Sequence, residues 1–122
     1  MATIREFTID GDRVMFVNQW RSTRNGFAHD AEFFYNGFSL VKTSCHYINR
    51  TWENYTFQSV MLKAIGIAMD EYTERQKRDF KAENGYRKMT AQRKEEFEKM
   101  LAKSGEYNKF IRIRDNIRGK VY

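Results

Sequence analysis

The sequence predicts an α+β fold, in which a four-stranded antiparallel meander sheet over about residues 2–48 precedes a long helix and further helices. Alternating apolar residues, interrupted by glycine-containing dipeptides, fill the first 48 positions, a pattern typical of antiparallel strands joined by tight turns. After residue 50 the apolar spacing changes from two to three and four, which is typical of amphipathic helices. With 122 residues, 41% of them hydrophobic, we expect a single domain over 1–122.

Turn dipeptides set the strand boundaries. They are Asp10-Gly11, Asn25-Gly26 and Asn36-Gly37. Asn-Gly supplies the two positive-φ residues of a type I′ hairpin turn, so we expect the third strand over 27–35 and the fourth over 38–48. The first strand has the weakest pattern, because Ile4 falls out of phase with Phe7 and Ile9.

Three helices are expected, over about 52–84, 91–103 and 106–118, with Thr51 and Thr90 as N-caps of the first two. The first helix ends in a highly polar stretch, which we expect to project from the body of the protein. Its apolar stripe is longer than the sheet beneath it, and the sheet has edges to protect. Together these features predict a homo-oligomer, a dimer or higher.

The net charge of +6 and the pI near 9.5 favour an anionic partner. Residues 1–50 carry six Lys and Arg against five Asp and Glu, so most of the excess belongs to the helical half. No run approaches the ~18 apolar residues of a membrane span, and the N-terminal residues have no signal-peptide core. A single cysteine cannot form an internal disulfide, and we therefore expect a cytoplasmic protein.

The residues favour binding over catalysis. Cys45 and His46 are adjacent on an expected strand and so point to opposite faces, and His29 is the only other nitrogen or sulfur ligand of the usual kind. A lone cysteine in such a strand is more often a small core residue than a nucleophile. No glycine-rich phosphate-binding loop is present. We expect no metal, no cofactor and no enzymatic activity.

The densest group of polar and aromatic residues lies where the last strand turns into the first helix. A strand-to-helix junction can present backbone N–H groups to an anion, arginine can contact phosphate in a bidentate manner, and aromatic rings can stack on a base. The candidate ligand-binding residues here are Tyr47, Asn49, Arg50 and Tyr55. A structural interpretation stands beside this one, in which Trp52 and Tyr55 fasten the helix to the sheet.

Two further basic groups are candidates. Arg112, Arg114 and Arg118 lie near the end of the sequence, where Arg114 and Arg118 share a helix face and can clamp a diphosphate. The alternative is that these charges offset the dipole at the end of the helix. Arg21 and Arg24 end the second strand, where they can flank a ligand or keep the sheet edge polar.

The overall layout and the junction resemble a known family. The junction reads Cys45-x-Tyr47-x-Asn49-Arg50-Thr51-Trp52-Glu53-x-Tyr55-x-Phe57-Gln58-Ser59-Val60. In these features the chain resembles the first family of phage Thoeris anti-defence proteins. The resemblance implies a sponge that binds and sequesters the cyclic ADP-ribose-type signal of a bacterial TIR-domain protein without cleaving it. It also implies an oligomer with ligand pockets where protomers meet, in the cytoplasm of an infected bacterial host.

Two other functions are weighed against the sponge. A phage inhibitor that covers a host defence protein with its charged helices, as an anti-CRISPR does, needs no pocket and would form a stoichiometric protein complex. A nucleic-acid binder would use the basic, aromatic-rich chain and its four-stranded sheet. That function is disfavoured because no RNP-like motif is present and acidic residues interrupt the basic ones throughout the helical half.

Overall fold

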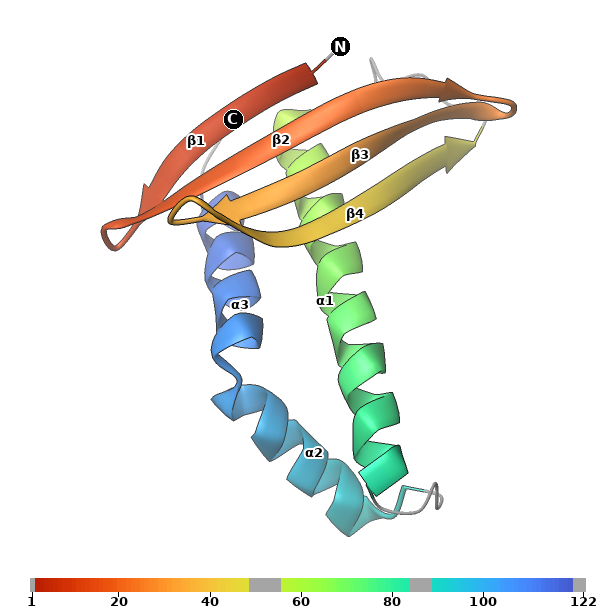
Figure 1. Ribbon diagram of the computed structural model, residues 1–122, viewed down its shortest axis with the longest axis vertical. Helices are drawn as coiled ribbons and strands as arrows, with labels where there is room; N and C mark the ends of the chain where they lie inside the picture. Colours follow the sequence, from red (N-terminus) through yellow and green to blue (C-terminus); the bar gives the residue numbers. More distant parts are fainter. Residues whose placement is uncertain (1, 49–55, 84–88, 120–122) are drawn as a thin grey trace.

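The computed structural model describes residues 2–48, 56–83 and 89–119 and confirms the α+β class. The sheet consists of β1 (Ala2–Ile9), β2 (Asp12–Thr23), β3 (Gly26–Tyr35) and β4 (Phe38–Ile48). Its strands follow the order β1-β2-β3-β4, and every neighbouring pair is antiparallel. Figure 1 shows the described helices on one side of this sheet, and none of them covers its other face.

The expected type I′ turn is confirmed at Asn36-Gly37 and is wrong at Asn25-Gly26, and the tight turn expected at Asp10-Gly11 has the same positive-φ backbone as Asn36-Gly37. Asp10 and Gly11 have φ values of 48° and 87°, and the turn between β3 and β4 repeats them with 50° and 85°, which matches the positive-φ pair of a type I′ turn. The third turn lies one residue earlier than expected. Thr23 pairs with Gly26, so Arg24 and Asn25 form the turn. Gly26 also pairs with β4, and that ladder extends β3 by one residue.

The helices are α1 (Phe57–Glu83), α2 (Ala91–Lys103) and α3 (Gly105–Arg118). Thr56 caps α1, because its Oγ1 accepts a hydrogen bond from the Ser59 N–H at 3.1 Å. The helix therefore begins later than the expected residue 52, and the expected cap Thr51 lies outside the described residues. Thr90 is confirmed as the cap of α2, accepting from the Arg93 N–H at 3.2 Å.

One serine joins the last two helices. Ser104 ends α2 and caps α3, where its Oγ accepts from the Tyr107 N–H at 3.2 Å. Its hydroxyl also lies 2.6 Å from the hydroxyl of Tyr72 on α1. The bend between α2 and α3 is thereby fixed to the middle of α1, and α3 returns antiparallel to α1 beneath the sheet (Figure 1).

The core lies between the sheet and the helices. Alternate residues of β2 and β3 point inward, and the rings of Phe16 and Phe33 meet there at a centroid distance of 4.9 Å. The helices contribute the complementary apolar faces, with Met61, Ala64 and Ile65 from α1 and Phe110, Ile113 and Ile117 from α3. The second half of α1 extends beyond the sheet together with α2 (Figure 1), as its polar sequence predicted.

The inner face also buries a histidine. His29 is 0% exposed, and its ring lies 4.8 Å from that of Trp20 between centroids. Burial, followed by the positive charge of Lys63, lowers the pKa of His29 from 6.5 to about 4, because a cationic imidazole is poorly solvated in an apolar layer. His29 is therefore neutral in the folded protein at physiological pH.

This histidine makes stability depend on pH. Since the unfolded chain takes up the proton near pH 6.5 and the folded chain only near pH 4, the free energy of unfolding should fall as the pH drops through this interval. The slope approaches about 1.4 kcal/mol per pH unit. Urea denaturation at several pH values between 7 and 5 measures it. His29→Gln, although less stable, should show a shallower slope, and an equal slope in both proteins would contradict the assignment.

Candidate functional site

Arg112 joins α3 to the hairpin between β1 and β2. Its Nη1 donates to Oδ2 of Asp12 at 3.1 Å and to the hydroxyl of Tyr35 at 2.6 Å, and its Nη2 donates to the carbonyl of Ile9 at 3.3 Å. Nη2 also lies 3.4 Å from Oδ2 of Asp10. The hydroxyl of Tyr35 in turn donates to Asp12 at 2.6 Å. We call these five residues the Arg112 clamp.

The carboxylate of Asp12 and the guanidinium of Arg112 stabilise each other in their charged forms. Hydrogen bonds from Asn36, Tyr35 and Arg112 lower the pKa of Asp12 to about 2, because each of them stabilises the carboxylate. Hydrogen bonding to Asp12 in turn raises the pKa of Arg112. The structure therefore places this guanidinium, which the sequence suggested for a phosphate, on two carboxylates, a hydroxyl and a carbonyl of its own chain.

Loss of the clamp should destabilise the fold. Arg112→Gln removes the guanidinium that donates to Asp12 and to the Ile9 carbonyl. Asp12 keeps its hydrogen bonds from Tyr35 and Asn36 but loses its cation, so we expect the melting temperature to fall by at least about 4 °C. Arg114→Gln is the matched control, because the ion pair of Arg114 within the described part of the chain is with its exposed neighbour Asp115, at 3.2 Å, and such pairs contribute little. Equal melting temperatures for the two variants, measured by circular dichroism, would show that the clamp is dispensable.

Arg21 and Arg24 lie at the opposite end of the sheet from the clamp. The Nε of Arg21 donates to Oδ2 of Asp30 at 3.2 Å, and the hydroxyl of Ser44 donates to the other oxygen of Asp30 at 2.6 Å. Both side chains of the ion pair are about half exposed. Arg24 is exposed in the turn between β2 and β3. Arg21 thus forms its described ion pair on an exposed face of the sheet.

The junction is described only at its two ends. Tyr47 belongs to β4, where it pairs with Phe27 near the β2–β3 turn, but its side chain is not among those described. Asn49, Arg50 and Tyr55 lie outside the described residues. Their role in binding stays a prediction.

The flanks of the junction are tied to the rest of the fold. Lys63 donates from Nζ to the carbonyl of His46 at 3.1 Å, which joins α1 to the end of β4. Gln58 donates from Nε2 to the carbonyl of Ile117 at 2.9 Å. The start of α1 is thereby placed beside the end of α3, where Arg118 follows Ile117 and is exposed. The structure thus brings Arg118 toward the junction and keeps Arg112 at the other end of the sheet.

A groove that the sequence did not indicate opens beneath the edge of β4. It has a volume of about 450 Å³ and lies between β4, α1 and α3, within the size range of small-molecule sites. Its cationic residues come from two elements, Lys42 from β4 and Arg75 and Arg78 from α1. The rest of its lining consists of Leu40, Val41, Ala68, Glu71, Glu106 and Phe110. We call this cavity the β4 groove.

Helix geometry explains how α1 serves the core and the groove at once. Ala68, Glu71, Arg75 and Arg78 recur at intervals of three and four, so they share one face beside the buried stripe. The guanidinium of Arg75 lies 5.8 Å from the centroid of the Tyr72 ring, which holds it near the body of the protein. The spacing of these four residues can be read from the sequence. The sequence does not indicate that the helix face they form lies against β4 and α3.

The described residues with reactive side chains are buried or dispersed. Burial raises the pKa of the Cys45 thiol to about 11, so the thiol is protonated at neutral pH. Within residues 2–48, 56–83 and 89–119, no three His, Cys, Asp or Glu side chains gather as metal ligands. None of the described helices combines the length and apolar character that crossing a membrane requires.

No protein family, curated protein or solved structure matches the chain.

Proposed function

We propose that this chain binds and sequesters a cyclic ADP-ribose-type nucleotide without cleaving it, as a phage Thoeris anti-defence protein in the cytoplasm of an infected bacterial host. The supporting observation is the β4 groove, in which Lys42, Arg75 and Arg78 from two separate elements surround one cavity. Cations fixed on a strand and a helix can hold both phosphates of a diphosphate at once. The resemblance at the junction supports the same class of ligand.

The chemistry of the groove suits both halves of such a ligand. Arginines donate paired hydrogen bonds to phosphate oxygens, and the apolar wall of Leu40 and Val41 offers a surface for a base. Glu71 and Glu106 add carboxylate acceptors, which suit ribose hydroxyls. The two acids also keep the net charge of the groove at +1, so that specificity rests on the placement of the cations.

The excess of positive charge supports capture. The chain carries a net charge of +6, which attracts a dianionic ligand over distances up to about a Debye length. A sponge needs fast capture and tight retention but no chemical step. Release of the intact ligand on unfolding is therefore the criterion that separates it from an enzyme.

A melting experiment tests this function. At about a hundredfold excess over its dissociation constant, a TIR-derived cyclic ADP-ribose should add about 2.7 kcal/mol to the free energy of unfolding and should return chemically unchanged after heating. Arg75→Gln with Arg78→Gln should remove most of the shift, because each lost charge-assisted hydrogen bond weakens binding about tenfold or more. Lys99→Gln on α2, which removes a cation outside the groove, is the control.

The other outcomes are equally informative. A shift that survives the Arg75 and Arg78 substitutions but disappears in Arg114→Gln with Arg118→Gln would move the site to the end of α3. A shift that neither double variant reduces would direct attention to Arg50 of the junction. An altered ligand would contradict sequestration, and no shift in the unmodified protein would contradict nucleotide binding.

One feature favours direct inhibition of a host defence protein as a second candidate. The arm formed by the end of α1 and by α2 extends away from the sheet (Figure 1) and is joined internally by Phe80 and Phe97, whose rings lie 5.6 Å apart. Its outer surface is charged, and Met100 is 38% exposed on it. This candidate predicts a stoichiometric complex with a protein of the host and no stabilisation by nucleotide.

A further inference from the structure

The face of the sheet opposite the helices carries a contiguous apolar patch. The register pairs Ile4 with Val17 and Met15 with Phe34, so these four side chains adjoin one another across β1, β2 and β3. Ile4 is 58% exposed, and the other three are partly exposed. The mismatch of Ile4 with the inward-facing residues of its strand thus places an apolar side chain on the outer face.

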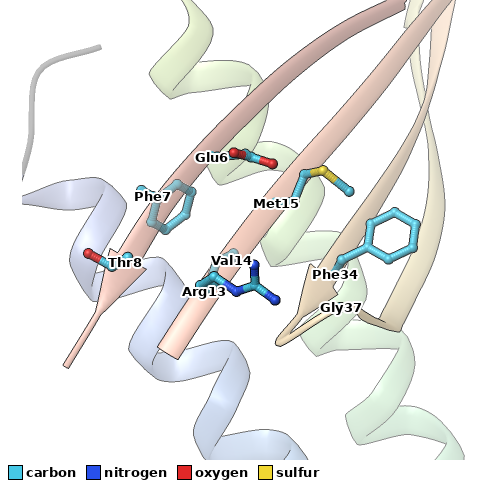
Figure 2. Close-up of a pocket in the computed structure, with 8 residues that line it drawn as sticks. All are labelled: Glu6, Phe7, Thr8, Arg13, Val14, Met15, Phe34 and Gly37. Atoms are coloured by element: carbon cyan, nitrogen blue, oxygen red, sulfur yellow. The ribbon is translucent and has the colours of Figure 1, made fainter. Parts of the chain in front are cut away.

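A shallow groove shares Met15 and Phe34 with this patch. It has a volume of about 430 Å³. Figure 2 shows the side chains of Met15 and Phe34 along it, with Glu6 and Arg13 at its rim. The side chains of Glu6 and Arg13 stand on neighbouring strands, diagonal to each other across the Glu6–Met15 and Thr8–Arg13 pairs. The patch therefore has an apolar centre and one charge of each sign beside it.

The charges of the whole outer face are balanced. Its acidic residues Glu6, Asp30 and Glu32 are matched by the basic residues Arg13, Arg21 and Lys42, as the alternation of the strands places them. Lys42 stands on the edge strand β4, where it also borders the β4 groove. This face thus lacks the positive excess of the rest of the chain. A balanced face suits a partner with the same balance better than a polyanion.

The exposed area of the chain also leaves room for a partner. The accessible surface is 8186 Å², whereas a compact monomer of 14.7 kDa exposes about 6,900 Å². The excess of roughly 1,300 Å² exceeds the approximately 800 Å² that each partner of a standard interface buries. The chain therefore exposes enough surface to bury an interface of standard size.

We propose that the outer face of the sheet binds a second copy of this chain in a two-fold symmetric dimer. A two-fold axis that passes near Met15, between Glu6 and Arg13, puts each Glu6 opposite the Arg13 of the other copy. It brings the two apolar patches together at the centre and sets the strands of the two sheets steeply across each other, near the orthogonal class of sheet packing. One charge pair made twice around an apolar centre is what an isologous interface requires.

This dimer leaves the β4 groove outside its interface, unlike the pockets between protomers that the resemblance implies. The β4 groove opens among α1, α3 and the edge of β4, whereas the apolar patch is centred on β1, β2 and β3. Assembly and nucleotide binding can therefore be measured separately. A failure of one proposal does not imply a failure of the other.

Sedimentation equilibrium of the full chain, without nucleotide, tests the interface. The unmodified protein should be a dimer at micromolar concentration. Met15→Glu, which puts a charge at the centre of the patch, should weaken dimerisation at least about a hundredfold while the circular dichroism spectrum stays unchanged. Met100→Glu is the control, because Met100 is an exposed apolar residue on α2. A monomer at all concentrations, or a dimer that only Met100→Glu dissociates, would overturn the proposal.

A charge exchange tests the orientation. Glu6→Arg and Arg13→Glu should each weaken the dimer about tenfold, because each places like charges opposite one another. The double exchange should restore the dissociation constant to within about threefold, since it reverses both pairs. If the double variant is no tighter than the single variants, Glu6 does not face Arg13 across the axis, and the proposed arrangement is wrong.

Discussion

Phe16 and Phe33, in contact on the inner face of the sheet, set the surface onto which α1 and α3 pack, and the positions of both helices depend on that contact. Because apolar residues of both helices are completely buried against the sheet or against each other, neither helix can shift without opening a cavity, which is costly in a close-packed core. The packing of both helices on the same face of the sheet has two consequences. One face of the sheet is left without cover from the described helices, and the part of α1 that extends beyond the sheet joins the β4 groove to the arm.

Polar contacts then fix the position of α3 along the sheet, which apolar packing alone leaves adjustable. Packing holds α3 beneath the sheet, but the Arg112 clamp determines its position along the hairpin, since the guanidinium reaches Asp10, Asp12 and the Ile9 carbonyl together. At the other end of α3, Ser104 is held by Tyr72. The hydrophobic effect has no direction, whereas these hydrogen bonds do. Both kinds of contact position the α3 side of the β4 groove, whose lining includes Phe110 and Glu106.

Local signals were sufficient for the elements of this fold, and long-range contacts were not available from them. The positive-φ requirement at Asn36 and the cap at Thr90 act within a few residues, so the sequence alone predicted both. Arg112 and Asp12 are separated by 100 positions, and no local pattern relates them, which is why this arginine was interpreted as a ligand for phosphate. The β4 groove was missed for the same reason, because its cations come from one strand and one helix that become neighbours only after folding.

The double role of α3 determines how binding experiments on this protein are to be interpreted. Phe110 is buried in the core and also lines the β4 groove, and the clamp holds the helix that carries it. A substitution of Arg112 would therefore weaken binding in the groove by displacing its floor, without any contact between Arg112 and a ligand. Arg75 and Arg78 stand on the exposed face of α1, where truncation removes charge and leaves the core intact. A loss of binding on substitution of Arg75 or Arg78 therefore identifies a residue that contacts the ligand. A loss on substitution of Arg112 does not, because Arg112 acts through the position of α3.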